Sequence, residues 1–138
     1  MDSYDEGMVV RLRSRLSWVF CIVGMIAIGI LSRVVHTGFV VLDKYLGDAL
    51  YAAMVYGIFR LLSGAAASAV CAAVVMTAIE SFQLTMIPAH MLTSEHFLTR
   101  ICARLMGVEF SFLDLLAYGV GIGCIYLVDT SRGTVKRA

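Results

Sequence analysis

The chain has 138 residues, of which 60% are hydrophobic and 15% are charged, and its formal net charge is +1. A soluble domain is about half apolar and about a quarter charged, so this composition excludes one, together with a disordered chain and a basic nucleic-acid binder. We therefore expect a single integral membrane domain, residues 1–138, that contacts membrane lipids and no nucleic acid.

Apolar runs predict four membrane-spanning helices, at about residues 14–34, 46–62, 64–87 and 110–128. A bilayer requires roughly 20 apolar residues per span, and the runs approach that length. The first run follows three arginines, as a signal peptide would, but no A-x-A-like cleavage site precedes Arg33, so we expect a retained helix. The expected fold is all-α, a four-helix transmembrane bundle with a short amphipathic helix at about 94–107 between the third and fourth spans.

The amphipathic segment carries two stripes of side chains at helical spacing. The apolar stripe consists of Phe97, Leu98, Ile101, Cys102, Leu105 and Met106, and the basic stripe of His96, Arg100 and Arg104. Two interpretations stay open. The helix could lie at the membrane surface with its basic side in water or at lipid headgroups, or the basic stripe could close over a site as a lid.

Positive charges predict the orientation of the spans. One side holds Arg11, Arg13, Arg15, Arg60, Arg132, Lys136 and Arg137, and the other holds Arg33, Lys44, Arg100 and Arg104. The side richer in lysine and arginine is normally cytoplasmic. Both termini are therefore expected in the cytoplasm, which an even number of spans allows.

Polar residues inside the apolar runs fall at one depth, because a helix rises about 1.5 Å per residue. In the orientation above, Asp48, Glu80 and Asp114 are all expected in the outer leaflet. Ionisable groups within a membrane usually face the bundle interior and mark a site, which predicts one shared polar pocket open to the outer side. Its candidate residues are Asp48, Glu80, Gln83, Arg100, Arg104, Asp114 and Tyr118, with Arg33, Asp43 and Lys44 as secondary candidates.

The chemistry of this pocket stays open at the level of the sequence. It could bind a polar headgroup, relay a proton or act as acid and base, and it could equally be a structural ion-pair network. No nucleophile elbow, phosphate loop or HExxH motif occurs, so the residues leave undecided whether the protein is an enzyme. The four cysteines and three histidines are scattered, so neither a metal nor a cofactor is expected.

Small residues on the last two spans predict close helix packing. Gly119 and Gly123 form a small-xxx-small pair, as do Ala65 and Ala69 on the preceding span. We expect both pairs to close helix contacts within the monomer rather than to form a dimer interface.

The segments Lys44–Leu50, Glu80-xx-Gln83 and Phe110–Tyr118 resemble the bacterial domain-of-unknown-function 2809 family, over roughly residues 13–128. Members often have tryptophan where this chain has Tyr51 and Phe112. The arrangement is also similar to the wider VanZ-like group, in which an acidic-x-x-Gln helix end is followed by an arginine and an aspartate opens the last span. Some VanZ-like proteins are associated with teicoplanin resistance, so the resemblance implies a protein of the bacterial inner membrane and the cell envelope, with no established biochemical activity.

These observations favour an outward-facing polar pocket that binds an envelope lipid or another amphiphile. Arg100 and Arg104 are the candidate phosphate contacts, because the planar guanidinium donates two parallel hydrogen bonds. One alternative is an enzyme that uses Glu80 and Asp114 as acid and base on a lipid-linked substrate. Another is a structural or accessory membrane subunit, and the oligomeric state stays open.

Overall fold

The structure is a computed structural model that describes residues 2–34, 40–106 and 109–135, with side chains described at 15–31, 45–104 and 109–132. Within these residues the chain forms helices joined by turns, with no strand, which confirms the expected all-α class. The helices are α1 (Asp2–Val34), α2 (Val40–Arg60), α3 (Ala65–Gln83), α4 (Ile87–Met91), α5 (Phe97–Met106) and α6 (Phe112–Val135).

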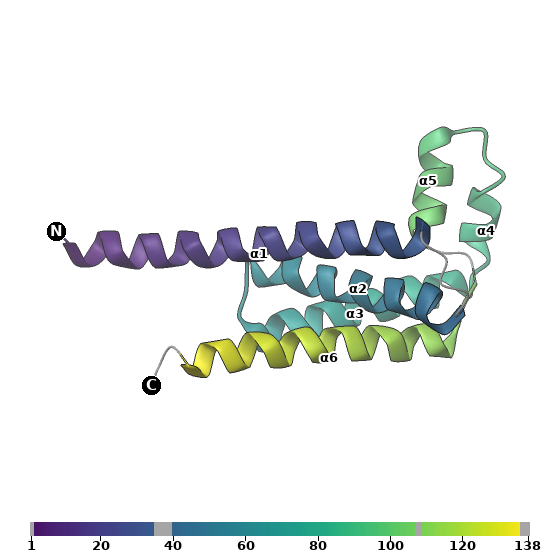
Figure 1. Ribbon diagram of the computed structural model, residues 1–138. Helices are drawn as coiled ribbons and strands as arrows, with labels where there is room; N and C mark the ends of the chain where they lie inside the picture. Colours follow the sequence, from purple (N-terminus) through teal and green to yellow (C-terminus); the bar gives the residue numbers. More distant parts are fainter. Residues whose placement is uncertain (1, 35–39, 107–108, 136–138) are drawn as a thin grey trace.

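The four long helices α1, α2, α3 and α6 lie side by side and alternate in direction (Figure 1). Helix α2 packs against α1, α3 and α6, and α3 also packs against α6, whereas within the described residues α1 packs against α2 alone. The start of α1 and the end of α6 lie at the same end of the molecule as the turn between α2 and α3 (Figure 1). Helices α4 and α5 lie at the opposite end.

Several helix boundaries differ from those expected from hydropathy. Helix α1 begins at Asp2 rather than near residue 14, and α6 continues to Val135 rather than ending at 128, because hydropathy marks the apolar part of a helix and not its ends. Helix α3 ends at Gln83 instead of 87. The chain leaves it through Met86, whose φ of 58° is left-handed, and Pro88 then occupies the first turn of α4.

The core lies between α2, α3 and α6 and combines small and large side chains. Tyr56 of α2 and Met76 of α3 are almost fully buried, and Ala52 and Ala72 allow the helices to approach. Trp18 of α1 packs against Tyr56 with their ring centroids 5.8 Å apart. This aromatic pair attaches α1 to the rest of the bundle.

The closest approach of α2 and α6 is at Gly121, where an added Cβ would collide with the backbone carbonyl of Ala49. Gly119 and Gly123 have no atom within 4 Å of the place where their Cβ would lie. The expectation that Gly119 and Gly123 close a helix contact is therefore wrong. Successive positions on a helix are about 100° apart, so Gly121 faces nearly opposite to those two glycines.

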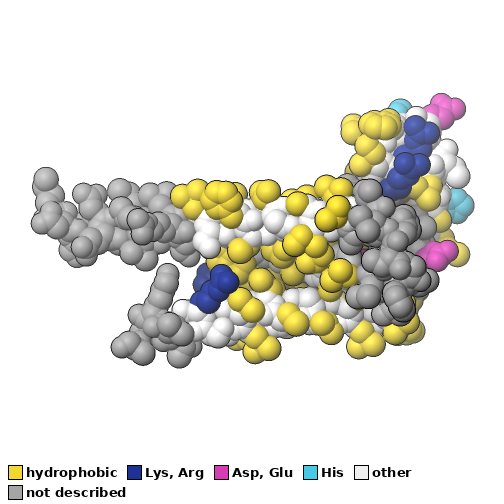
Figure 2. All heavy atoms as spheres, viewed as in Figure 1, with side chains coloured by type: hydrophobic (Ala, Val, Ile, Leu, Met, Phe, Trp, Pro, Cys, Tyr) yellow, Lys and Arg dark blue, Asp and Glu magenta, His cyan; other side chains and the backbone are white. Residues whose placement is uncertain are grey.

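The outer surface of the long helices is apolar (Figure 2). Two segments, Ala65–Gln83 and Phe112–Arg132, are long and apolar enough to cross a membrane, and only 22% and 28% of their apolar windows are buried. A core helix of a soluble protein would be mostly buried. The apolar stretch Arg15–Leu31 of α1 is shorter than a full span among the described side chains.

Candidate functional site

The carboxylate of Glu80 joins α3 to the beginning of α6. Glu80 is completely buried, and its Oε1 accepts a hydrogen bond of 2.7 Å from the backbone N–H of Ser111. Its Oε2 accepts a hydrogen bond of 3.1 Å from the hydroxyl of Tyr118. Both carboxylate oxygens therefore bind donors that come from one neighbouring helix and the residue before it.

Ser111 is the residue from which α6 starts. Its carbonyl accepts hydrogen bonds from the N–H groups of Asp114 and Leu115, which form the first turn. The backbone N–H groups at a helix start carry a partial positive charge that favours a nearby anion. The negative charge of Glu80 is thus placed at the positive end of the α6 dipole.

Carboxylates from three helices lie within electrostatic range of the Tyr118 hydroxyl. Besides Glu80, the carboxylates of Asp48 on α2 and Asp114 on α6 interact electrostatically with its hydroxyl. Asp114 and Gln83 are buried, Gln83 lies one helical turn after Glu80, and Asp48 is the only member of the group that is partly exposed. We call Asp48, Glu80, Gln83, Asp114 and Tyr118 the acidic cluster.

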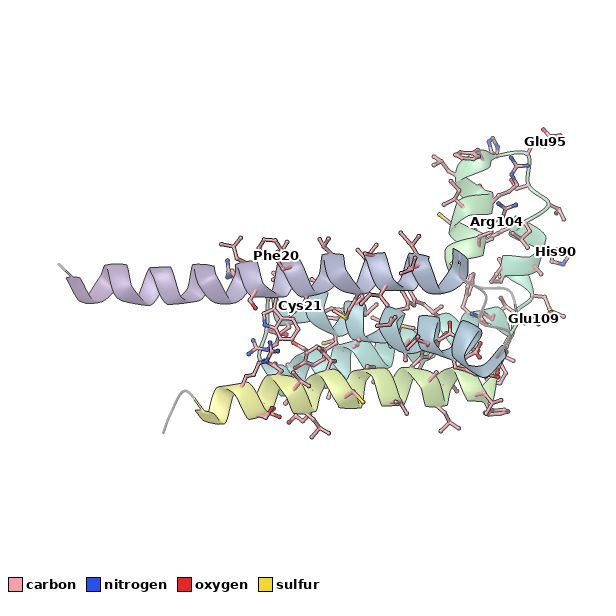
Figure 3. All side chains as sticks on the ribbon, in the orientation of Figure 1. Phe20, Cys21, His90, Glu95, Arg104 and Glu109 are labelled. Carbon is pink, nitrogen blue, oxygen red and sulfur yellow. The ribbon has the colours of Figure 1, made fainter. Side chains whose placement is uncertain are left out.

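The remaining primary candidates, Arg100 and Arg104, lie outside the acidic cluster. Both are exposed on α5, and neither forms an ion pair with any carboxylate whose side chain the structure describes. Figure 3 shows Arg104 on the part of the chain that projects from the end of the long helices. The structure therefore does not show the lid interpretation, in which Arg100 and Arg104 would pair with these carboxylates: α5 packs against α4 and α3, and its arginines are exposed.

The secondary candidates Arg33, Asp43 and Lys44 lie outside the described side chains. The backbone places Arg33 near the end of α1 and the other two near the start of α2. Those positions are at the same end of the molecule as the acidic cluster (Figure 1).

A second polar contact, at the opposite end of the bundle, was missed by the sequence analysis. The Nε of Arg60 lies 2.6 Å from Oδ2 of Asp129, and the Tyr56 hydroxyl donates to the same oxygen at 2.7 Å. The sequence analysis used Arg60 only as one of the positive charges that predict orientation, and Asp129 lies just after the predicted end of the last span. The i, i+4 spacing of Tyr56 and Arg60 was a signal that both face one neighbour.

The carboxylates of the acidic cluster can accept hydrogen bonds and attract a positively charged group. Within the described residues, no three histidine, cysteine, aspartate or glutamate side chains are grouped so as to hold a metal ion. A carboxylate offers about four acceptor positions, and Glu80 is seen to use two. Amines and hydroxyl groups are the donors that such a cluster would attract.

A comparison with known families matches residues 35–122 to the family described as "Protein of unknown function (DUF2809)". The match covers more than half of the chain and includes all five residues of the acidic cluster, but not Asp129. No curated protein and no solved structure matches the chain.

Proposed function

We propose that the chain, which belongs to the DUF2809 family of proteins of unknown function, is a multi-pass membrane protein that binds the polar headgroup of an envelope lipid or another amphiphile. The acidic cluster is the proposed site. The observation that carries this proposal is that Glu80, Gln83 and Asp114 are buried, with Glu80 hydrogen-bonded to the Tyr118 hydroxyl, inside a bundle whose exterior is apolar.

The distribution of polarity supports a membrane location. Glu80, Gln83 and Asp114 are buried, whereas large apolar side chains such as Phe20, Val70 and Leu116 are exposed. In water this arrangement would place hydrocarbon against solvent and carboxylates in the core. In a bilayer both groups are favourably placed, because lipid solvates the apolar exterior and ionisable groups face the interior.

Four membrane passes account for the arrangement of the long helices. Helix α2 has 21 residues and α1 has 33, so each is long enough to cross hydrocarbon about 30 Å thick, in addition to the two apolar segments of α3 and α6. The proposed orientation has both termini in the cytoplasm of a bacterial inner membrane, with α4, α5 and the acidic cluster toward the outer side. The excess of positive charge at the end with the termini supports it.

Asp48 is the proposed point of entry for the headgroup, because it is the only partly exposed member of the acidic cluster. Its carboxylate would attract an ammonium or hydroxyl group, and Asp114 and Glu80 would extend that negative field inward. A headgroup with an amine, such as that of phosphatidylethanolamine, is the ligand class with the best charge complementarity. We take this lipid as the first one to test.

The test is native mass spectrometry of the full chain released from nanodiscs that contain phosphatidylethanolamine and phosphatidylcholine in equal amounts. We expect preferential retention of phosphatidylethanolamine by the wild type and loss of that preference in Asp48→Asn. Glu109→Gln is the matched control, because it removes one exposed carboxylate at the same end of the molecule. Equal retention of the two lipids by the wild type would refute this ligand class.

A structural role of the acidic cluster is the second candidate, in keeping with an accessory membrane subunit. The bonds from Glu80 to Ser111 and Tyr118 favour it, because they connect α3 to α6. The two functions differ in what Asp48→Asn changes. A loss of stability without any change in lipid retention supports the structural role, whereas altered retention in a stable protein supports binding.

A further inference from the structure

Helix α5 is oriented differently from the four long helices. It lies at the end of the bundle and runs across the direction of α1, α2, α3 and α6 (Figure 1). If the long helices cross a membrane, a helix in this position lies along the membrane surface rather than through it. The turn between α4 and α5 carries Glu95 farther out, away from the long helices (Figure 3).

The apolar side of α5 is not covered by the protein. Ala103 is fully buried where α5 packs onto α4 and α3, but Phe97 and Leu98 are 67% and 74% exposed, and Cys102 is also exposed. Figure 2 shows hydrophobic side chains on the side of α5 that faces back along α1. If the long helices cross a membrane, the apolar side of α5 therefore faces the same hydrocarbon layer as the apolar exterior of the bundle.

The basic side of α5 is directed differently from its apolar side. Arg100 and Arg104 are one helical turn apart and exposed, and neither is paired with a described carboxylate. Figure 2 shows basic side chains on the part of α5 opposite its apolar side, near histidine and acidic side chains. Two guanidinium groups at this spacing can each donate paired hydrogen bonds to a phosphate.

We infer that α5 is an interfacial helix whose apolar side enters the edge of the hydrocarbon layer while Arg100 and Arg104 bind the phosphates of anionic phospholipids. Amphipathic helices with a basic side bind membranes in this way, through buried apolar area and attraction to anionic lipid. The inference rests on the membrane placement proposed above, but it does not require that the acidic cluster bind a ligand. It gives the two arginines a role that is separate from the acidic cluster.

The first test measures immersion with spin labels on the full chain in nanodiscs of phosphatidylglycerol and phosphatidylcholine. The native cysteines Cys21, Cys71, Cys102 and Cys124 are replaced by alanine, and single labels are attached at Leu98→Cys, Glu95→Cys and Val74→Cys. We expect the label at 98 to collide mainly with oxygen, as at the lipid-facing position 74, and the label at 95 to collide mainly with a water-soluble nickel complex.

A water-exposed label at 98 beside a lipid-exposed label at 74 overturns the inference for α5 alone. A water-exposed label at 74 overturns the membrane placement itself.

The second test measures headgroup preference by native mass spectrometry of protein released from the same nanodiscs. Arg100→Gln/Arg104→Gln is compared with Arg15→Gln/Arg132→Gln, which removes the same charge from exposed arginines at the other end of the bundle. We expect the α5 variant to lose retained phosphatidylglycerol relative to the control variant by roughly fivefold for each arginine. Equal retention by the two double variants would show that α5 is not an anionic-lipid contact. Asp48→Asn should lose the preference for phosphatidylethanolamine in the first kind of nanodisc and should retain phosphatidylglycerol like the wild type in the second kind. That pair of results would show that the acidic cluster and α5 bind lipid independently.

Discussion

The Nε of Arg60, the last residue of α2, lies 2.6 Å from the Oδ2 of Asp129 on α6. The Tyr56 hydroxyl donates to the same carboxylate oxygen at 2.7 Å, and the Nη1 of Arg60 donates to the carbonyl of Ser63 at 2.9 Å. The contact therefore connects α2, α6 and the turn before α3. The side chains of Arg60 and Asp129 are 29% and 12% exposed, so the pair is largely shielded from water.

Loss of this ion pair is expected to destabilise the bundle at the end that holds the termini. Asp129→Asn removes the charge that compensates Arg60 and weakens the bond from Tyr56, at a cost of about 1–3 kcal/mol. Thermal unfolding in detergent measures the cost, and Arg132→Gln serves as the control for an exposed charge on the same helix. A double-mutant cycle with Arg60→Gln should give a coupling between Arg60 and Asp129, and additive effects would show that the contact contributes nothing.

Substitutions of Glu80 should separate its hydrogen-bonding role from its charge. Glu80→Ala leaves the Ser111 N–H and the Tyr118 hydroxyl without their acceptors in a buried place, at a cost of about 2–4 kcal/mol. Glu80→Gln retains a carbonyl oxygen for the Ser111 N–H, and its amide can donate to Tyr118, so we expect less than half of that loss. Thermal unfolding of both variants beside Glu109→Ala checks the prediction. A glutamine variant as unstable as the alanine variant would contradict it and would make the negative charge at the start of α6 the stabilising feature.

The three glycines of α6 are expected to respond differently to a methyl group. Gly121→Ala places a Cβ against the Ala49 carbonyl and should cost about 1–3 kcal/mol or more, because neither backbone can move without disturbing the contact of α2 with α6. Gly119→Ala and Gly123→Ala add a methyl group where nothing lies within 4 Å, and alanine favours helix, so these variants should be neutral or more stable. The comparison is one of unfolding temperatures. Destabilisation by Gly119→Ala instead would indicate that its exposed side packs against another protein.

The proposed orientation of the chain in the membrane predicts which positions an impermeant thiol reagent can reach in cells. In the cysteine-free background, Glu95→Cys should be labelled from outside the inner membrane, because it lies at the end with α4 and α5 (Figure 3). Ser131→Cys, near the end of α6, should be labelled only after the membrane is permeabilised. The reverse pattern would place the acidic cluster in the cytoplasmic leaflet and would exclude an envelope lipid of the outer leaflet as its ligand.

The sequence by itself determined the helical class and the burial of Glu80, Gln83, Asp114 and Tyr118. Ionisable groups within apolar helices usually face the interior of a bundle, so the burial of these residues could be predicted. The sequence was informative here because polar residues are rare within these apolar runs and are therefore easy to recognise.

Only the tertiary structure decided which of these groups touch. The interior of this bundle and its outer surface are both apolar, so hydropathy carries almost no signal for the rotation of each helix about its axis. For that reason Gly121 rather than Gly119 contacts α2, and Arg60 finds Asp129 across the bundle. The hydrogen bond from the Ser111 N–H to Glu80 depends on the residue at which α6 starts. The position of Arg104, away from the long helices, depends on the direction in which α5 projects. Neither the start of α6 nor the direction of α5 can be read from the hydropathy of the sequence.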